Sequence, residues 1–209
     1  MVLLAAIAFG VWLFRFFQVQ SLLQTLLDRI ESTNGSLRVD DVQGNALLRS
    51  TNGSVRLYRA QGTYDVHTTN GSIEMSVHSG DVKARTTNGG IRVDGLDGSL
   101  TAESTNGAIH ARITGVAALP LKLETTNGGI EVTVDKQPAG MQASTTNGTI
   151  TVRLPAALKA SIRASGSSVS SDFDINGDVE KKRVRGTING GGPLFDMSTS
   201  NGRIRLERL

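Results

Sequence analysis

The sequence predicts an all-β protein: a parallel β-helix (β-solenoid) of about 18-residue coils, with an N-terminal α-helix. Two observations predict the solenoid. A Thr-Asn-Gly tripeptide, with Ser replacing Thr in its last copy, recurs at nearly constant spacing. Apolar and polar residues alternate around every copy in the same phase. An apolar stripe at helical period near the N-terminus predicts the helix.

The repeated asparagines define the coil length. Their steps are 18, 18, 18, 18, 21, 20 and 54 residues, and short insertions around 117–120 and 137–140 explain the two intermediate steps. We expect these asparagines to stack into a structural turn ladder that exchanges amide hydrogen bonds. Because Gly reaches positive φ cheaply and Asn tolerates the left-handed region, each pair should turn the chain sharply. The asparagines are Asn34, Asn52, Asn70, Asn88, Asn106, Asn127, Asn147 and Asn201.

Each Asn-Gly pair lies between two predicted strands. The third and fifth residues after each asparagine are apolar and the fourth is polar, as in Ile91, Arg92 and Val93. The strand before the turn alternates in the same way and ends on Ser or Thr, as in 82–86. This period is typical of a strand with one buried face, and stacked coils bury faces that a single coil leaves exposed.

Two other architectures fit less well. Asn-Gly between alternating runs is typical of a hairpin, but an antiparallel meander does not repeat both strand patterns in one phase every 18 residues. A hexapeptide helix needs an aliphatic residue every six positions, and the sixth and twelfth residues after Ile91 are Asp97 and Glu103. We therefore expect a flattened solenoid with two main faces.

The N-terminal segment, 1–31, differs from the solenoid domain expected at 32–209. Residues 2–14 form an apolar run of 13, short for a membrane-spanning helix of about 20 residues, and a helical apolar stripe follows from Phe16 to Ile30. We expect one hydrophobic or amphipathic helix here. It either caps the open end of the solenoid or anchors the protein to a membrane, and both roles are compatible.

The repeat weakens between 154 and 193. Residues 164–169 (ASGSSV) take the place expected one period after Asn147, without the asparagine. The charged stretch 172–185 is expected to form an irregular coil or a protruding loop. A glycine-rich segment, 187–192, then leads to a last regular coil with Phe195 and Met197.

These coils resemble a bacterial family of adhesin-like domains of unknown function with TTNGxI-type β-solenoid repeats. The resemblance rests on the serial TTNGxI motifs and on the closing segment GTINGGGPLFDMSTSNGRIRL, and it covers about 32–209. It implies a β-solenoid that is exported or membrane-tethered in bacteria. The adhesin label does not fix function, because one fold serves many functions.

The chemistry-bearing residues point away from an enzyme. The chain has no cysteine, no Ser-His-Asp order, no phosphate loop and no HExxH motif, so we expect no catalytic residue, cofactor or metal. Of the three histidines, His67 and His110 fall on outward strand positions, and the third is His78. Asp is absent from the Asn-Gly turns, unlike in calcium-binding solenoids. The net charge of +3 is spread over both signs without interleaved aromatics, which disfavours nucleic-acid binding.

These observations favour a non-enzymatic, membrane-tethered, extracytoplasmic scaffold or adhesin-like binding module of the cell envelope, in the periplasm or at the cell surface. Its expected partners are an envelope glycan or protein along a solenoid face, and a membrane through the N-terminal helix. The alternative is a cytoplasmic, filament-forming structural protein, similar to bactofilins, that stacks end to end. A helix cap at one end and the basic Arg203, Arg205 and Arg208 at the other argue against that alternative.

Overall fold

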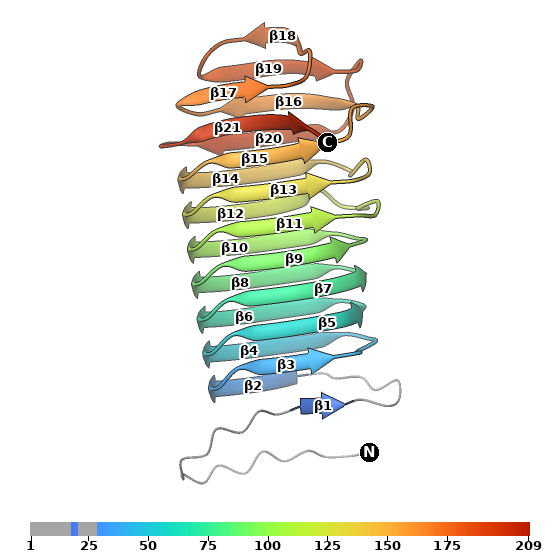
Figure 1. Ribbon diagram of the computed structural model, residues 1–209, viewed down its shortest axis with the longest axis vertical. Coiled ribbons are helices and arrows are strands. Elements are labelled where there is room, and N and C mark those ends of the chain that lie inside the picture. The colour runs from blue at the N-terminus through green and yellow to red at the C-terminus, as the bar shows by residue number, and fades with distance from the viewer. Residues whose placement is uncertain (1–17, 21–28) are drawn as a thin grey trace.

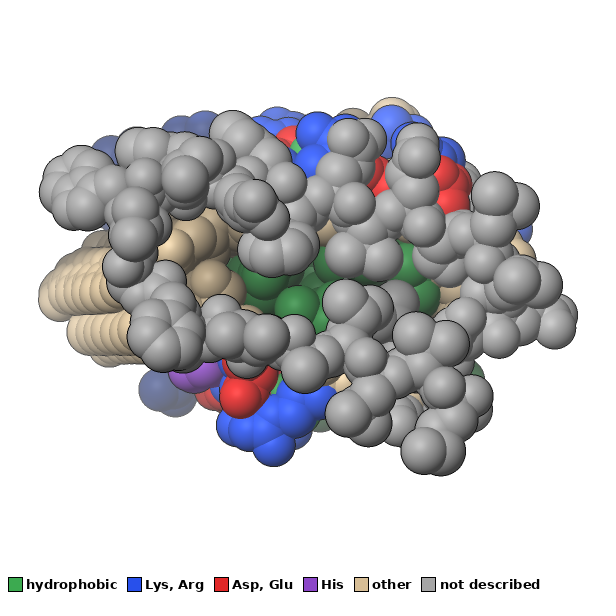
Figure 2. Space-filling view, turned by 90° about the horizontal axis from the view of Figure 1, so that it is seen from below, with side chains coloured by type: hydrophobic (Ala, Val, Ile, Leu, Met, Phe, Trp, Pro, Cys, Tyr) green, Lys and Arg blue, Asp and Glu red, His purple; other side chains and the backbone are tan. Residues whose placement is uncertain are grey.

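The computed structural model describes residues 18–20 and 29–209, which form a β-solenoid whose coils stack along one long axis (Figure 1). Two sheets face each other across a thin apolar core, which Figure 2 shows from one end of the stack with charged side chains on the outside. The predicted all-β parallel solenoid with two main faces is confirmed. Tyr64 is fully buried in this core, where its hydroxyl oxygen lies 2.9 Å from the carbonyl oxygens of both Val42 and Gln61, the acceptors for its one proton.

The two sheets take alternate strands of the chain. In spatial order, sheet A contains β1 (Gln18–Gln20), β3 (Leu37–Asp40), β5 (Val55–Gln61), β7 (Ile73–Ser79), β9 (Ile91–Leu96), β11 (Ile109–Ile113), β13 (Ile130–Val134), β15 (Ile150–Leu154), β21 (Arg203–Arg208) and β17 (Ser168–Ser171). Sheet B contains β18 (Asn176–Val179), β19 (Arg183–Ile188), β16 (Ala160–Ser165), β20 (Leu194–Thr199), β14 (Met141–Asn147), β12 (Leu121–Asn127), β10 (Leu100–Asn106), β8 (Val82–Asn88), β6 (Tyr64–Asn70), β4 (Ala46–Asn52) and β2 (Arg29–Asn34).

The predicted N-terminal α-helix is wrong. The described part of the chain contains no helix, and β1 and β2 are strands that pair in parallel with β3 and β4. Parallel pairing with the first regular coil supplies partners for the backbone groups of these residues, and such tertiary pairing overrides a helical apolar pattern. The remainder of the predicted helix, 1–17 and 21–28, lies outside the described residues. Among the residues that the structure describes, no helix has the length and apolarity needed to cross a membrane.

The last regular coil does not lie at the end of the solenoid. β20 pairs in parallel with β14 on one side and β16 on the other, and β21 lies between β15 and β17 (Figure 1). Residues 194–208 therefore occupy the place that the sequence analysis gave to 164–169. The charged stretch does not form a loop: β19 pairs antiparallel with β16, and β18 with β19.

The Asn-Gly turns are tight for a different reason from the one predicted. Neither residue of any ladder pair has a positive φ; the left-handed region is used at the opposite bends of the coils, as at Gly62 with φ of 132°. The ladder glycines are required because neighbouring coils approach closely. A Cβ on Gly107 would lie 2.0 Å from the carbonyl oxygen of Gly89. Close stacking of backbones, not positive φ, selects glycine there.

Candidate binding surface

The asparagines form one continuous hydrogen-bonded ladder along an edge of the solenoid. Each amide nitrogen donates to the side-chain oxygen of the asparagine one coil nearer the N-terminus, as from Asn106 to Asn88 at 2.9 Å. The ladder passes from Asn147 directly to Asn201 at 2.9 Å, because the last regular coil is inserted there. The other bonds join Asn52 to Asn34, Asn70 to Asn52, Asn88 to Asn70, Asn127 to Asn106, and Asn147 to Asn127, at 2.8–3.0 Å.

A second ladder lies just inside the first. The buried Ser or Thr two residues before each ladder asparagine donates its hydroxyl proton to the turn glycine carbonyl of the preceding coil, as from Thr125 to Gly107 at 2.9 Å. Sequence analysis noted this Ser/Thr position but not its partner, although a hydroxyl at an inward strand position was a signal for one. The members are Ser50, Thr68, Thr86, Ser104, Thr125, Thr145 and Thr199.

An open polar groove crosses the outer face of sheet B beside these ladders. It spans β6 to β14, and we call it the axial groove; its volume is about 490 Å³. One wall is a row of hydroxyls, and the other is a row of charged or polar side chains in register from strand to strand. The hydroxyl row is Thr87, Thr105 and Thr126; the opposite row is His67, Arg85, Glu103, Glu124 and Ser144; Thr86, Ser104 and Thr125 lie between them.

The charges of the axial groove are linked to one another. Glu103 accepts from Arg85 at 2.8 Å and from Lys122 at 3.4 Å, and Lys122 also lies 3.3 Å from Glu124. Burial disfavours the charged form of Glu103, but its bonds to Arg85 and Lys122 outweigh burial and lower its pKa. Hydrogen bonds to Glu124 and Glu103 raise the pKa of Lys122. Both shifts favour the charged forms, so Glu103 and Lys122 are an ion pair at neutral pH.

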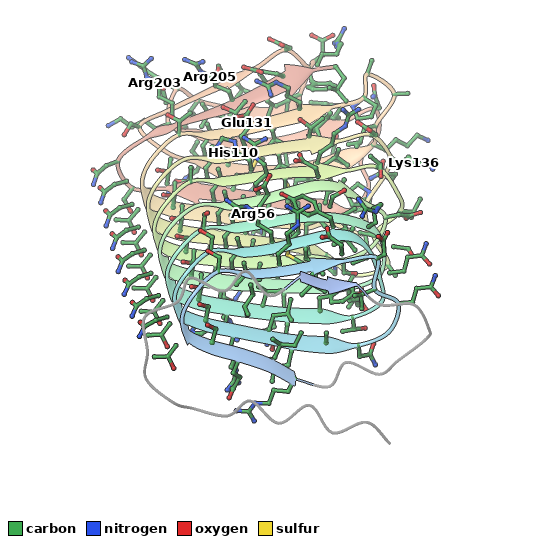
Figure 3. The ribbon with its side chains drawn as sticks, turned by 60° about the horizontal axis from the view of Figure 1, so that its bottom comes forward. Arg56, His110, Glu131, Lys136, Arg203 and Arg205 are labelled. Carbon is green, nitrogen blue, oxygen red and sulfur yellow. The ribbon has the colours of Figure 1, made fainter. Side chains whose placement is uncertain are left out.

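Sheet A carries a comparable row of ions on its outer face. Arg56, His110 and Glu131 follow one another up this face (Figure 3), with His110 Nδ1 at 3.1 Å from Glu131. Arg153 contacts Glu131 and lies 3.0 Å from Glu207. The hydrogen bond from Arg153 is the main cause that lowers the pKa of Glu131.

The residues singled out from the sequence are widely separated. His67 lines the axial groove, whereas His110 lies in the ion row of sheet A. Within the described residues, no group of three or more His, Cys, Asp or Glu side chains is placed to hold a metal. Arg203 and Arg205 do not form an end surface, because their strand, β21, has β15 on one side and β17 on the other. Arg208 packs over the Phe173 ring at 5.3 Å.

Comparison with known proteins identifies this fold at the level of a family. Residues 29–207 match the family described as Toastrack DUF4097, a domain of unknown function. No curated protein and no solved structure gives a significant match. The expectation of a domain-of-unknown-function family is confirmed, and the match carries no adhesin role.

Proposed function

The chain belongs to the Toastrack DUF4097 family, and from that premise we propose that it is a non-enzymatic binding scaffold of the cell envelope, tethered to a membrane outside the cytoplasm. A β-solenoid of this family fits a structural or binding module. The observation that carries the proposal is the axial groove, which presents hydroxyl and charged groups in two parallel rows. We propose that an extended envelope glycan lies in it.

The geometry of the groove suits a linear, polyhydroxylated polymer. Neighbouring strands lie about 4.8 Å apart, so each coil repeats a set of donors and acceptors at a spacing close to the length of one sugar unit. Both rows belong to sheet strands held on each side by neighbours, so little side-chain and backbone ordering opposes binding. A shallow groove binds each unit weakly, and affinity accumulates along the polymer.

Removal of the hydroxyl row tests the groove. A triple variant, Thr87→Val, Thr105→Val and Thr126→Val, keeps side-chain shape and β-propensity but deletes three hydroxyls from one wall. Each lost hydrogen bond contributes roughly 1 kcal/mol, so binding to purified envelope polysaccharide should weaken by about a hundredfold. The measurement is co-sedimentation of the full chain with insoluble polysaccharide.

A matched control uses hydroxyls on the opposite face. Thr133→Val and Thr151→Val change half-buried threonines on the outer face of sheet A and should leave binding unchanged. Equal binding by the groove triple and the wild type would remove the groove from the proposal. Binding only to envelope protein extracts, sensitive to the same triple, would replace the glycan by a protein ligand.

Tethering outside the cytoplasm is tested separately by fractionation of the native host. The support for it is the apolar run at 2–14 and the family resemblance described above. The protein should pellet with membranes, and protease added to spheroplasts should cut the repeats. A soluble cytoplasmic protein would contradict this part of the proposal.

End-to-end filament formation is the less favoured function. The antiparallel pair β18 and β19 interrupts parallel stacking at one end of sheet B. β18 is short and fully exposed, and it carries Asp178, features that blunt a strand edge against pairing with another chain. Purified protein that forms filaments visible by electron microscopy would reverse this preference.

A further inference from the structure

The ladder has a chemical consequence for the asparagines themselves. Asn-Gly is the dipeptide most prone to spontaneous deamidation, because glycine leaves its own nitrogen sterically free to attack the preceding side chain. The chain contains ten such pairs. Eight belong to the ladder, and the other two are Asn176-Gly177 and Asn189-Gly190. The fold places these ten pairs in very different hydrogen-bonding environments.

The reaction needs two groups to be free. The backbone nitrogen of the glycine loses its proton and attacks Cγ of the asparagine; the new N–Cγ bond closes a succinimide, and the Cγ–Nδ2 bond breaks to release ammonia, which carries away the proton. Water then opens either carbonyl of the ring, which gives aspartate or isoaspartate. Hydrogen bonds that hold the amide group or the glycine N–H must break before the attacking geometry is reached.

Both groups are held at Asn88, an interior member of the ladder. The Asn88 amide nitrogen donates to Asn70 at 2.8 Å, and its oxygen accepts from Asn106 at 2.9 Å. The N–H of the following glycine, Gly89, donates to the Asn106 carbonyl at 3.1 Å, so the nucleophile is also held. The same backbone bond is made by Gly35, Gly71 and Gly128, at 3.1–3.2 Å.

The pairs outside the ladder differ from each other. Asn189 donates to the carbonyls of Ala156 and Leu158, at 2.9 and 2.8 Å, and is therefore held. Asn176 lies in β18, the exposed edge strand of sheet B, and its side chain makes no hydrogen bond within the described residues. Its backbone pairs with β19, but its side-chain amide is the least restrained of the ten.

We propose that Asn176-Gly177 is the primary deamidation site of the folded protein, and that the asparagine ladder keeps its interior Asn-Gly pairs as amides. Within the described residues, Asn34 and Asn201 each make one ladder bond where an interior member makes two, so they react at intermediate rates. A deamidated ladder member would place a carboxylate where its amide donates to the next oxygen. By slowing deamidation, the ladder therefore preserves the amide groups whose hydrogen bonds form it. Product formation at Asn176 adds a negative charge beside Asp178 and leaves the axial groove unaltered.

The test is a time course of the intact protein in neutral, ammonium-free buffer at 37 °C, with deamidation of each Asn-Gly peptide followed by mass spectrometry. Three hydrogen bonds restrain the Asn88 pair, each at the net strength of an ordinary one, so Asn176 should react about 150-fold faster than Asn88. In denaturant, the ten pairs should react at similar rates. Equal rates for Asn176 and Asn88 in the folded protein, or the same ranking in denaturant, would overturn the proposal.

A ladder variant provides the second measurement. Asn88→Ala removes the acceptor of Asn106, which should then deamidate about 5-fold faster because one hydrogen bond is lost. Asn147, two ladder steps beyond Asn106, should keep its wild-type rate and serves as the internal control. An unchanged rate at Asn106 would contradict protection by the ladder. A rise at every site would indicate an unfolded variant, and the wild-type comparison of Asn176 with Asn88 would then decide.

Discussion

Substitution of one ladder glycine tests whether close stacking of backbones, and not φ, makes glycine necessary. A Cβ on Gly107 would lie 2.0 Å from the Gly89 oxygen, which is 1.4 Å (3.4 − 2.0) short of the nearest ordinary contact. That oxygen belongs to the backbone of the turn between β8 and β9, which is hydrogen-bonded to the next coil and cannot rotate away. We therefore expect Gly107→Ala to push the two coils apart at this turn.

The size of the effect follows from the bonds that join those coils. Three are exposed to the displacement: Asn106 to Asn88 at 2.9 Å, Ser104 to the Gly89 carbonyl at 3.0 Å, and the Gly89 N–H to the Asn106 carbonyl at 3.1 Å. At roughly 1 kcal/mol each, their loss destabilises the protein by about 3 kcal/mol. For a chain of this size the melting temperature should fall by about 6–12 °C.

The matched control is Gly90, which follows Gly89 in the turn of the preceding coil. Gly90→Ala adds a Cβ 3.2 Å from the Ala108 oxygen, at a position that already carries alanine in the next coil, and Gly90 has no left-handed φ. This change should be neutral within about 0.5 kcal/mol, or slightly stabilising. Thermal unfolding followed by circular dichroism measures both variants. If Gly107→Ala costs no more than Gly90→Ala, close packing is not the reason for the glycine.

Three further predictions concern the ladders and the inserted coil. Thr125→Val leaves the part-buried carbonyl of Gly107 without its donor and should cost about 1–3 kcal/mol in the free energy of unfolding, whereas the exposed Thr126→Val should cost under about 0.5 kcal/mol. The folded-state pKa of Glu131 is lowered, so its contribution to stability is present above the ordinary value of 4.5 and is lost as pH falls through the folded value. Glu131→Gln should therefore reduce the loss of unfolding free energy that the protein shows as the pH is lowered through this range. Ser144→Cys with Ser198→Cys, whose hydroxyls lie 3.2 Å apart, should form a disulfide on oxidation and stabilise the protein by about 2–4 kcal/mol.

Each of these has a result that would contradict it. Equal losses for the two threonine variants in urea unfolding would show that the inner hydroxyl ladder contributes nothing. If the unfolding free energy falls equally with acid in the wild type and in Glu131→Gln, Glu131 does not contribute to the pH dependence of stability. The chain has no native cysteine, so a double-cysteine variant that stays reduced would show that β14 and β20 are not neighbours.

The repeat made most of the fold predictable, since period, strand faces and ladder all follow from residues that recur in one phase. The helix prediction failed because the apolar spacing from Phe16 to Ile30 reflects a local preference. The strand at Arg29–Asn34 is instead determined by parallel pairing with β4 of the neighbouring coil. The insertion of 194–208 could not be predicted because β16 and β20 both show the apolar and polar alternation of a regular coil. Either strand could therefore pair with β14. Their order depends on competition between distant segments.

The axial groove could not be predicted as a site. The residues of its two walls fall at outward positions of the alternating strands, and no residue type there is unusual for a solvated face. What distinguishes the surface is that the two rows line up from coil to coil, which depends on register between coils. Sequence periodicity gives that register only after the solenoid has been established.

The position of residues 194–208 also sets the order in which the protein can be completed during translation. Coils up to β15 can be added one after another as the chain emerges, each on the coil made just before it. β16 and β17 are synthesised next, yet their partners β20 and β21 do not exist until 194–208 have been made. A ribosome that stops within that interval therefore leaves a chain whose coils are stacked up to β15, while β16 and β17 lack their partner strands.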